Sequence, residues 1–162
     1  MTASQTGLGP VHIYVCHHAA GIAFEDDVFR PIQVGRALAS TTLPMRGDDT
    51  GDNISSKNRE YCELTALYWA WKNDLDAAWI GFMHYRRFLD FACTGLKTDQ
   101  FGCIPLPDMT PQTLKQMGLN AATVRKTIEN TPDACAILPE KWSVRNVGFT
   151  SFYQHYVEAD YH

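Results

Sequence analysis

Short apolar runs alternate with longer amphipathic stretches along the chain, and this pattern predicts strands that alternate with helices. Val11–Cys16 is short, apolar and rich in β-forming residues, so it predicts a buried first strand. Ala77–Met83 has the same character and predicts a second strand. Ala134–Leu138, closed by Pro139, predicts a third. These runs are too short to be helices of ordinary length.

Four stretches have helical character: Pro31–Ala39, Asn58–Lys72, Asn120–Glu129 and Asn146–Glu158. Asn58–Lys72 is the clearest of them. Leu64, Leu67, Tyr68 and Trp71 fall at i, i+3, i+4 and i+7, which predicts one apolar stripe packed against the core.

The order of these elements predicts an α/β fold with a mainly parallel sheet and helices on both faces. In such sheets, ligands bind beyond the carboxyl ends of the strands. His17–His18 follows the first predicted strand, and His84–Arg87 ends the second. We therefore expect these segments and the acidic loop Gly47–Asn53 to converge on one cleft. Leu89–Thr110, with its glycines and prolines, predicts a long loop.

Composition narrows the function classes. The 162 residues suit one domain, with a polar, disordered lead-in over residues 1–10 and the domain over 11–162. The net charge is -4 and there is no basic block, which argues against a nucleic-acid partner. No apolar run approaches the ~18 residues of a membrane span, and the start lacks signal-peptide character. Five scattered cysteines indicate reduced thiols in a cytoplasmic protein.

The segment His84-Tyr85-Arg86-Arg87 is the strongest chemical signal. Two guanidinium groups at a strand end could neutralise a diphosphate and bind it through paired donors. Neighbouring residues on a strand face opposite ways, so only one of His84 and Tyr85 would face the site. The alternative is a pair of solvated arginines beside a core tyrosine and histidine.

The turn Asp48–Asn53 is densely acidic. Carboxylates there could hold Mg²⁺ or Mn²⁺, with Asp49 and Asp52 as the candidate ligands, or could bind sugar hydroxyls. The local chemistry alone favours a solvated turn. His17 and His18 could also ligate a metal, although no third ligand has convincing spacing.

Glu60 falls within the predicted apolar stripe, near the start of the helix, and Glu63 falls at its edge. A carboxylate on a packed face needs polar partners, so we expect Glu60 to be buried and hydrogen-bonded, and to contact a sugar or act as a base. The alternative is stabilisation of the helix terminus. Gln33 and Gly35 fall in the early predicted helix, where Gly35 would allow close packing or close approach of a ligand.

The central block resembles a bacterial family found in capsule, exopolysaccharide and O-antigen gene clusters, long labelled a domain of unknown function and linked to glycosyl transfer. The resemblance rests on Asp48–Ser55, Lys57-Asn58, Tyr61–Ala66, Tyr68–Asn73 and His84–Arg87. Weaker matches are Ile13–Val15 with His18, Pro31–Gly35, Ile137–Pro139 and Tyr153–Tyr156.

The resemblance implies a GT-A-like, Rossmann-like fold. It also implies transfer of a hexose, galactofuranose among the candidates, from a nucleoside diphosphate donor to a surface polysaccharide. The implied catalytic residues are Asp49, Asp52, Glu60 and Glu63, and the implied donor- or phosphate-binding residues are His18, Gln33, Asn53, His84, Tyr85, Arg86 and Arg87. The comparable GT-A strand end carries an Asp-x-Asp metal motif. This chain carries His84–Arg87 there, so no metal is assigned, with Mg²⁺ or Mn²⁺ at Asp49 and Asp52 as the alternative.

The implied partners are a nucleotide sugar and a glycan or lipid-linked acceptor, with peripheral contact at the inner face of the membrane. The chain departs from the family in having Ala19 where lysine is frequent, and family domains run on past His162, so we expect a C-terminal part to be lacking. Two other readings remain open. One is a non-catalytic nucleotide-sugar- or carbohydrate-binding remnant, and the other is a metal-dependent hydrolase built on the acidic turn and His17-His18.

Overall fold

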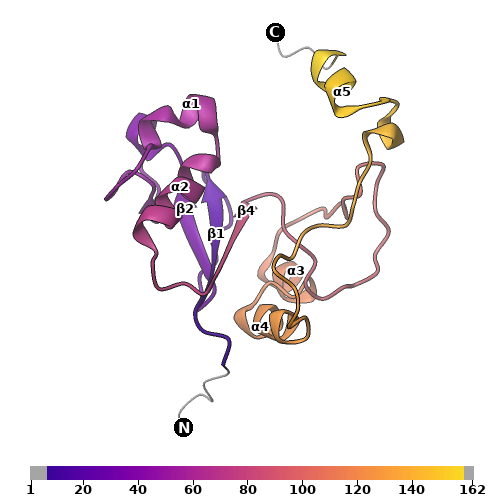
Figure 1. Cartoon of the computed structure of the whole chain (residues 1–162), viewed down its shortest axis with the longest axis horizontal. Helices are drawn as coiled ribbons and strands as arrows, with labels where there is room; N and C mark the ends of the chain where they lie inside the picture. Colours follow the sequence, from indigo (N-terminus) through magenta and orange to yellow (C-terminus); the bar gives the residue numbers. More distant parts are fainter. Residues whose placement is uncertain (1–6, 159–162) are drawn as a thin grey trace.

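Four parallel strands form the centre of the computed structural model, which describes residues 7–158 (Figure 1). The strands are β1 (Val11–His17), β2 (Phe29–Gln33), β3 (Arg46–Gly47) and β4 (Trp79–His84). Their spatial order is β3-β2-β1-β4, and every pairing is parallel. The carboxyl ends of β1 and β4 are therefore neighbours, since Cys16 pairs with His84.

The helices are α1 (Asn58–Tyr61), α2 (Leu64–Asn73), α3 (Pro111–Gln116), α4 (Ala121–Glu129) and α5 (Phe152–Glu158), with 3-10 turns η1 (Arg36–Leu38), η2 (Ser55–Lys57) and η3 (Val144–Val147). Successive residues of β1 point to opposite faces of the sheet. Ile13 and Val15 pack with residues of α3 and α4, whereas Tyr14 and Cys16 pack with α2. The predicted α/β fold, with a parallel sheet and helices on both faces, is confirmed.

Two predicted elements are wrong. Residues 31–39 are not a helix, because Pro31–Gln33 belongs to β2 and only η1 follows. A proline is tolerated in this strand because β3 pairs only with Ile32 and Gln33, so β2 resembles an edge strand at Pro31. Ala134–Leu138 is not a strand, since the structure has no regular element there.

The predicted helix over residues 58–72 is two helices, separated at Cys62, whose φ of 47° departs from helical geometry. The predicted buried stripe is also wrong: Leu64, Leu67 and Trp71 are 56%, 45% and 61% exposed. The buried residues of α2 are Thr65, Ala66, Trp69 and Ala70. Small side chains let the backbone of α2 lie close to the sheet, and Trp69 fills the remaining space against Tyr14.

The prediction that Glu60 is buried and hydrogen-bonded is also wrong. Its side chain is exposed and makes no hydrogen bond with any residue in the described part of the chain. Residue 60 lies in α1, before the break at Cys62, so it follows no packed stripe. A carboxylate at the start of a helix and in water needs no buried partner.

Two of the elements predicted for the C-terminal half are confirmed. The helix predicted over Asn120–Glu129 is confirmed as α4, with the Asn120 side chain capping it by accepting from Thr123 N. The loop over residues 89–110 is confirmed. The tract Asn146–Glu158 is interrupted, because Gly148 adopts a φ of 92° between η3 and α5. All five cysteines are free.

The predicted lead-in lies partly outside the described residues, which begin at Gly7. Leu8 packs against the core beside β1, and the Pro10 carbonyl accepts from Ala78 N at 2.8 Å. Over residues 7–158, no helix has the length and apolar character needed to cross a membrane.

Candidate functional site

Aromatic and basic side chains gather where β1 and β4 end. The His18 ring lies 5.8 Å from His84 and 5.2 Å from Tyr85, and the Tyr85 ring stacks on His17 at 5.1 Å. The Tyr85 amide donates to the Cys16 carbonyl at 3.0 Å, which extends the parallel pairing one residue beyond β4. We call His17, His18, Glu63, His84, Tyr85, Arg86 and Arg87 the strand-end cluster.

His84 connects this cluster to the start of α2. Its Nδ1 accepts from the Arg86 amide at 3.1 Å, so the proton of the neutral ring lies on Nε2. Nε2 lies 3.8 Å from a carboxylate oxygen of Glu63. Burial is the main cause that lowers the pKa of His84, and the positive charges of Arg86 and Arg87 lower it further against the opposing effect of Glu63. His84 is therefore neutral near pH 7 and points its N–H toward a carboxylate.

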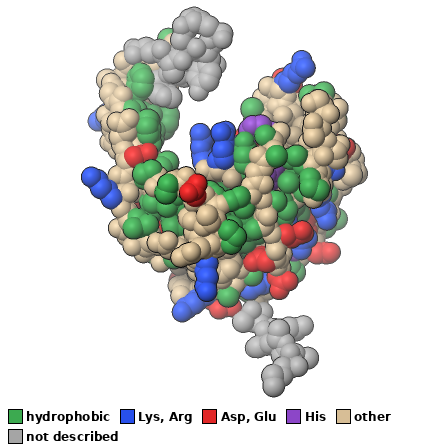
Figure 2. All heavy atoms as spheres, turned by 180° about the vertical axis from the view of Figure 1, so that it is seen from behind, with side chains coloured by type: hydrophobic (Ala, Val, Ile, Leu, Met, Phe, Trp, Pro, Cys, Tyr) green, Lys and Arg blue, Asp and Glu red, His purple; other side chains and the backbone are tan. Residues whose placement is uncertain are grey.

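Both arginines of the cluster are exposed. The Arg86 guanidinium lies over the Tyr85 ring, 5.1 Å from its centre, a cation–π contact that limits its orientations. The Arg87 amide donates to the His84 carbonyl at 2.9 Å, which closes a tight turn. Neither guanidinium pairs with a carboxylate of residues 7–158. Figure 2 shows basic and histidine side chains side by side at a hollow of the surface.

His17 and His18 differ sharply, although they are neighbours in sequence. His18 is exposed, whereas His17 is fully buried and neither of its ring nitrogens has a hydrogen-bond partner. Burial lowers the pKa of His17 against the opposing effect of the Ala19 backbone, which lies near the ring without the geometry of a hydrogen bond. Strand alternation alone does not separate them, because β1 is buried on both faces; His17 is still within β1 and stacks on Tyr85, whereas His18 follows the end of the strand.

The acidic turn is fastened to the fold by its first carboxylate. Asp48 is fully buried and accepts hydrogen bonds from Gly35 N at 2.8 Å, Arg36 N at 3.1 Å, Ser55 Oγ at 2.5 Å and Thr65 Oγ1 at 2.6 Å. Gly35 is suited to this contact because its φ is 62°, and a Cβ there would lie 2.6 Å from the Asn58 side chain. Asp48 is thus a structural residue, which the sequence pattern did not distinguish from the other carboxylates of the turn.

The other residues of the turn run along α2, away from the strand-end cluster. Asp52 Oδ1 accepts from the Tyr68 hydroxyl at 3.1 Å, and the Asp52 carbonyl accepts from Asn73 at 2.9 Å. Asn53 hydrogen-bonds within the turn, to Gly51 O and Ser55 N. Asp49 is exposed, and its carboxylate lies so close to Gly47 that a Cβ at residue 47 would clash with it. The structure therefore brings together the two strand-end segments and Glu63, but not Asp49, Asp52 or Glu60.

The Gln33 side chain also forms its hydrogen bonds within the protein. Its amide donates to the Thr41 carbonyl at 2.7 Å, and its carbonyl oxygen accepts from Leu43 N at 2.8 Å and Arg36 Nε at 3.0 Å. The side chain is 1% exposed. This geometry holds the loop after β2, and burial keeps the polar atoms of Gln33 away from a ligand.

The structure offers no carboxylate set for a cation. Among residues 7–158, no three His, Cys, Asp or Glu side chains are grouped so that they could hold a metal ion. Asp49 and Asp52, the candidate ligands, are used differently and do not face each other through any shared contact. The described residues therefore form no site of three protein ligands for Mg²⁺ or Mn²⁺, and we assign no step to either ion.

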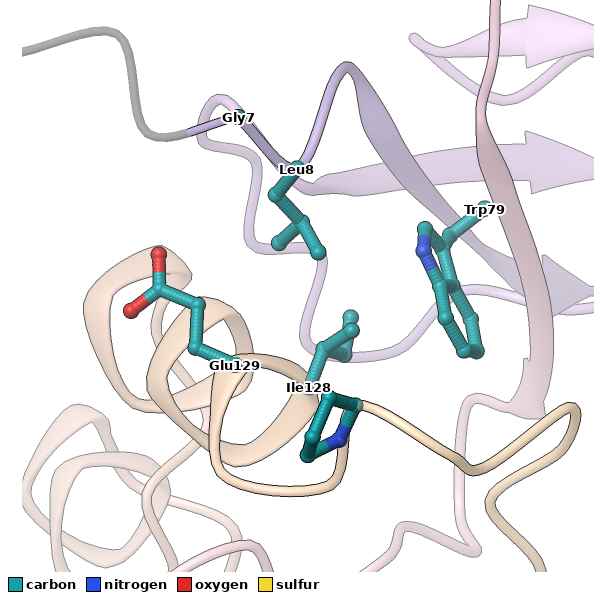
Figure 3. Close-up of a pocket in the computed structure, with 6 residues that line it drawn as sticks. Gly7, Leu8, Trp79, Ile128 and Glu129 are labelled. Atoms are coloured by element: carbon teal, nitrogen blue, oxygen red, sulfur yellow. The ribbon is translucent and has the colours of Figure 1, made fainter.

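A shallow pocket opens at the other end of the sheet (Figure 3). Gly7 and Leu8 line it before β1, Trp79 at the start of β4, and Ile128, Glu129 and Pro132 at the end of α4. Its lining is mainly apolar and contains none of the predicted site residues. Since ligands of such folds bind beyond the carboxyl ends of the strands, we place the candidate site at the strand-end cluster.

Comparison with solved structures finds one relevant likeness. The chain is 41% identical to a structure titled "WbbM bifunctional glycosytransferase apo structure", with a TM-score of 0.79 over 90% of this chain and 25% of that chain. The chain thus spans about a quarter of the length of that solved protein. The likeness supports the predicted GT-A-like fold.

Comparison with curated proteins finds no match. Residues 12–162 match a protein family described as "Domain of unknown function (DUF4422)". The match covers nearly the whole chain and includes every residue of the strand-end cluster and of the acidic turn. The chain belongs to the DUF4422 family.

Proposed function

We propose that this chain binds the nucleoside diphosphate sugar of a glycosyltransferase and that the strand-end cluster receives the diphosphate. The observation that carries the proposal is the pair Arg86 and Arg87, exposed beyond β4 and without a carboxylate partner among the described residues. The 41% identity to a protein named as a bifunctional glycosyltransferase supports this choice over other anionic ligands.

The chemistry requires positive charge at this place. When a sugar is transferred, the bond between its anomeric carbon and the phosphate oxygen breaks, and the diphosphate leaves with added negative charge. Preorganised cationic groups that meet this charge lower the barrier. Arg86 already rests on Tyr85, and guanidinium donors match phosphate oxygens in pairs.

The acceptor hydroxyl must lose a proton as its oxygen bonds to the anomeric carbon. We propose Glu63 as the base, because its carboxylate is partly exposed and lies 3.8 Å from His84 Nε2. The neutral His84 would orient Glu63. Because His84 carries no charge, it would not disfavour the uptake of a proton by the Glu63 carboxylate. Asp49, Asp52 and Glu60, which the resemblance also implies, stay outside this arrangement.

The finer assignments follow from the family resemblance. We propose a hexose donor, galactofuranose among the candidates, and a surface glycan or lipid-linked acceptor. Transfer to such an acceptor would take place in the cytoplasm, with peripheral contact at the inner face of the membrane.

Isothermal titration calorimetry with UDP, GDP and a panel of their hexose conjugates tests the proposal, in paired titrations with EDTA and with added Mn²⁺. We expect binding to the wild-type chain and its loss in the double variant Arg86→Ala/Arg87→Ala. Lys115→Ala, which removes an exposed positive charge from α3, is the matched control.

Two results would overturn parts of the proposal. Binding that vanishes with EDTA but survives both arginine substitutions would move the diphosphate to a metal site. Donor binding without hydrolysis or transfer, for this chain and for a longer relative, would favour a non-catalytic nucleotide-sugar-binding domain.

A further inference from the structure

A second pair of arginines lies at the β2–β3 edge of the sheet. Arg30 on β2 and Arg46 on β3 line a polar pocket of about 220 Å³, together with Glu25, Pro31 and Met45. The strand-end cluster follows β1 and β4 and shares no lining residue with this pocket. Two guanidinium groups that face one small cavity repel each other unless an anion lies between them.

Arg30 is held from behind by a chain of hydrogen bonds. One of its terminal nitrogens lies 2.7 Å from His12 Nε2, and His12 Nδ1 lies 2.6 Å from an Asp74 carboxylate oxygen. Arginine only donates, so His12 Nε2 accepts and the ring carries its proton on Nδ1. Asp74 thereby fixes His12, and His12 fixes the plane of the Arg30 guanidinium.

One donor of Arg30 lacks a partner. Its Nε is buried and has no hydrogen-bond partner. A buried donor left unpaired costs free energy, roughly 1–3 kcal/mol by general experience.

Arg46 is oriented by an aromatic ring. Its guanidinium lies over the Trp69 ring, 5.0 Å from the centre, and the Trp69 indole N–H is in turn held by Thr50 at 2.9 Å and 3.0 Å. Both guanidinium groups are therefore positioned before any ligand arrives. Preorganised donors lose less conformational entropy on binding.

No carboxylate of residues 7–158 pairs directly with either arginine, and Asp74 acts on Arg30 only through His12. Across residues 7–158, neither Arg30 nor Arg46 has a carboxylate oxygen within 4.0 Å, and the ion pairs involve other residues. Glu25 lines the pocket but stays beyond that distance. The pocket thus presents two positive charges and one negative charge at its wall.

We propose that the Arg30–Arg46 pocket binds a phosphate group. A phosphate carries about two negative charges at neutral pH and several acceptor oxygens, so it can accept hydrogen bonds from both guanidinium groups at once. A carboxylate has only two acceptor oxygens and so offers fewer hydrogen bonds to two guanidinium groups than a phosphate does. The site is independent of the diphosphate site that we propose at Arg86 and Arg87.

Calorimetry with inorganic phosphate, at ionic strength held constant with potassium chloride, tests this inference on the full chain. We expect phosphate to bind the wild-type chain and Arg46→Met to weaken that binding by about tenfold or more, the scale of a lost charged hydrogen bond. Methionine keeps the contact with Trp69, so the fold is preserved. Glu25→Gln should tighten binding, because it removes the negative charge from the wall, and Lys115→Met should change nothing.

The arms also separate this site from the diphosphate site. Phosphate binding that is unchanged in Arg46→Met but lost in Arg86→Ala/Arg87→Ala would overturn the inference and locate phosphate at the strand ends. No detectable phosphate binding would overturn it as well. A fall in thermal stability of Glu25→Gln without tighter binding would show that Glu25 is the internal partner of the arginines. Nucleoside diphosphate binding retained in Arg46→Met leaves the proposed function standing whatever the phosphate result.

Discussion

The strand-end cluster and the acidic turn look equally chemical as sequence, yet the structure uses their charges in opposite ways. The buried carboxylate of Asp48 is consumed by four donors inside the fold. Arg86 and Arg87 have no carboxylate partner among residues 7–158 and stay exposed. A charged side chain whose bonds are satisfied internally supports the fold, whereas one left exposed beside aromatic rings is available for a ligand. The partners, and not the density of charge, distinguish the two regions.

The largest effect should come from breaking the acidic turn at Asp48. Asp48→Ala leaves two backbone amides and two hydroxyls without their acceptor, so we expect it to lower the free energy of unfolding by about 3–5 kcal/mol. Urea unfolding followed by circular dichroism measures this. Asp49→Ala, at an exposed neighbour, should stay within about 0.5 kcal/mol of the wild type. Equal losses at both positions would erase the distinction between structural and free carboxylates.

The strand-end cluster should show the reverse signature. Arg86→Lys keeps the charge but loses the paired donors, and we expect it to weaken binding of a nucleoside diphosphate sugar by about 1–3 kcal/mol. The midpoint of urea unfolding should not change, since Arg86 is exposed. Titration calorimetry and unfolding on the same preparation give both values. A loss of stability with intact binding would make Arg86 a structural residue.

His17 sharpens the comparison, because it belongs to the cluster but is buried. His17→Phe keeps the ring stacked on Tyr85 and removes two unpaired nitrogens, so we expect a gain of about 1 kcal/mol in the free energy of unfolding. Thermal unfolding at neutral pH measures the gain. A substantial loss would mean that a water molecule or a ligand pairs these nitrogens.

The pH dependence of stability gives a second test at the same residue. Burial lowers the pKa of His17 in the folded state, so the unfolded chain takes up a proton first as pH falls. The stability that neutral His17 contributes is full above about pH 6.5, the unfolded value, and is lost as pH falls below it. His84 contributes in the same direction. Between pH 7.5 and 5, the midpoint temperature of thermal unfolding should therefore fall less steeply for His17→Phe than for the wild type.

The smallest effect should come from the outer face of α2. Trp71 is 61% exposed, so we expect Trp71→Ser to change the free energy of unfolding by less than about 0.5 kcal/mol. On the inner face, Ala70 is fully buried, and Ala70→Leu should cost about 1–3 kcal/mol through overpacking. Chemical denaturation of both variants measures the contrast. A costly Trp71→Ser would show that the aromatic face is packed after all.

The sequence by itself determined the architecture. Short β-rich runs that alternate with helical stretches were sufficient to predict a parallel sheet with helices on both faces, since these are local patterns of period, although β2 and β3 were not among the predicted strands. The same logic located the polar segments after β1 and β4. The rule that parallel strands end at one edge brought His18 and Tyr85 together, although 66 residues of chain separate them in the sequence.

Only the tertiary structure decided which side of each element is inside. Leu64, Leu67 and Trp71 formed the strongest apolar stripe, yet the sheet selected Ala66 and Ala70, because close approach of α2 to Tyr14 and Cys16 requires small side chains. Pro31 joined a strand because its neighbours pair with β1, a contact that no local pattern encodes. The hydrogen bonds that satisfy Asp48 and Gln33, and the absence of a carboxylate partner for Arg86 among the described residues, depend on atoms distant in the sequence. Hydrogen-bond partners are a property of the assembled fold, so the separation of structural from functional charge had to await it.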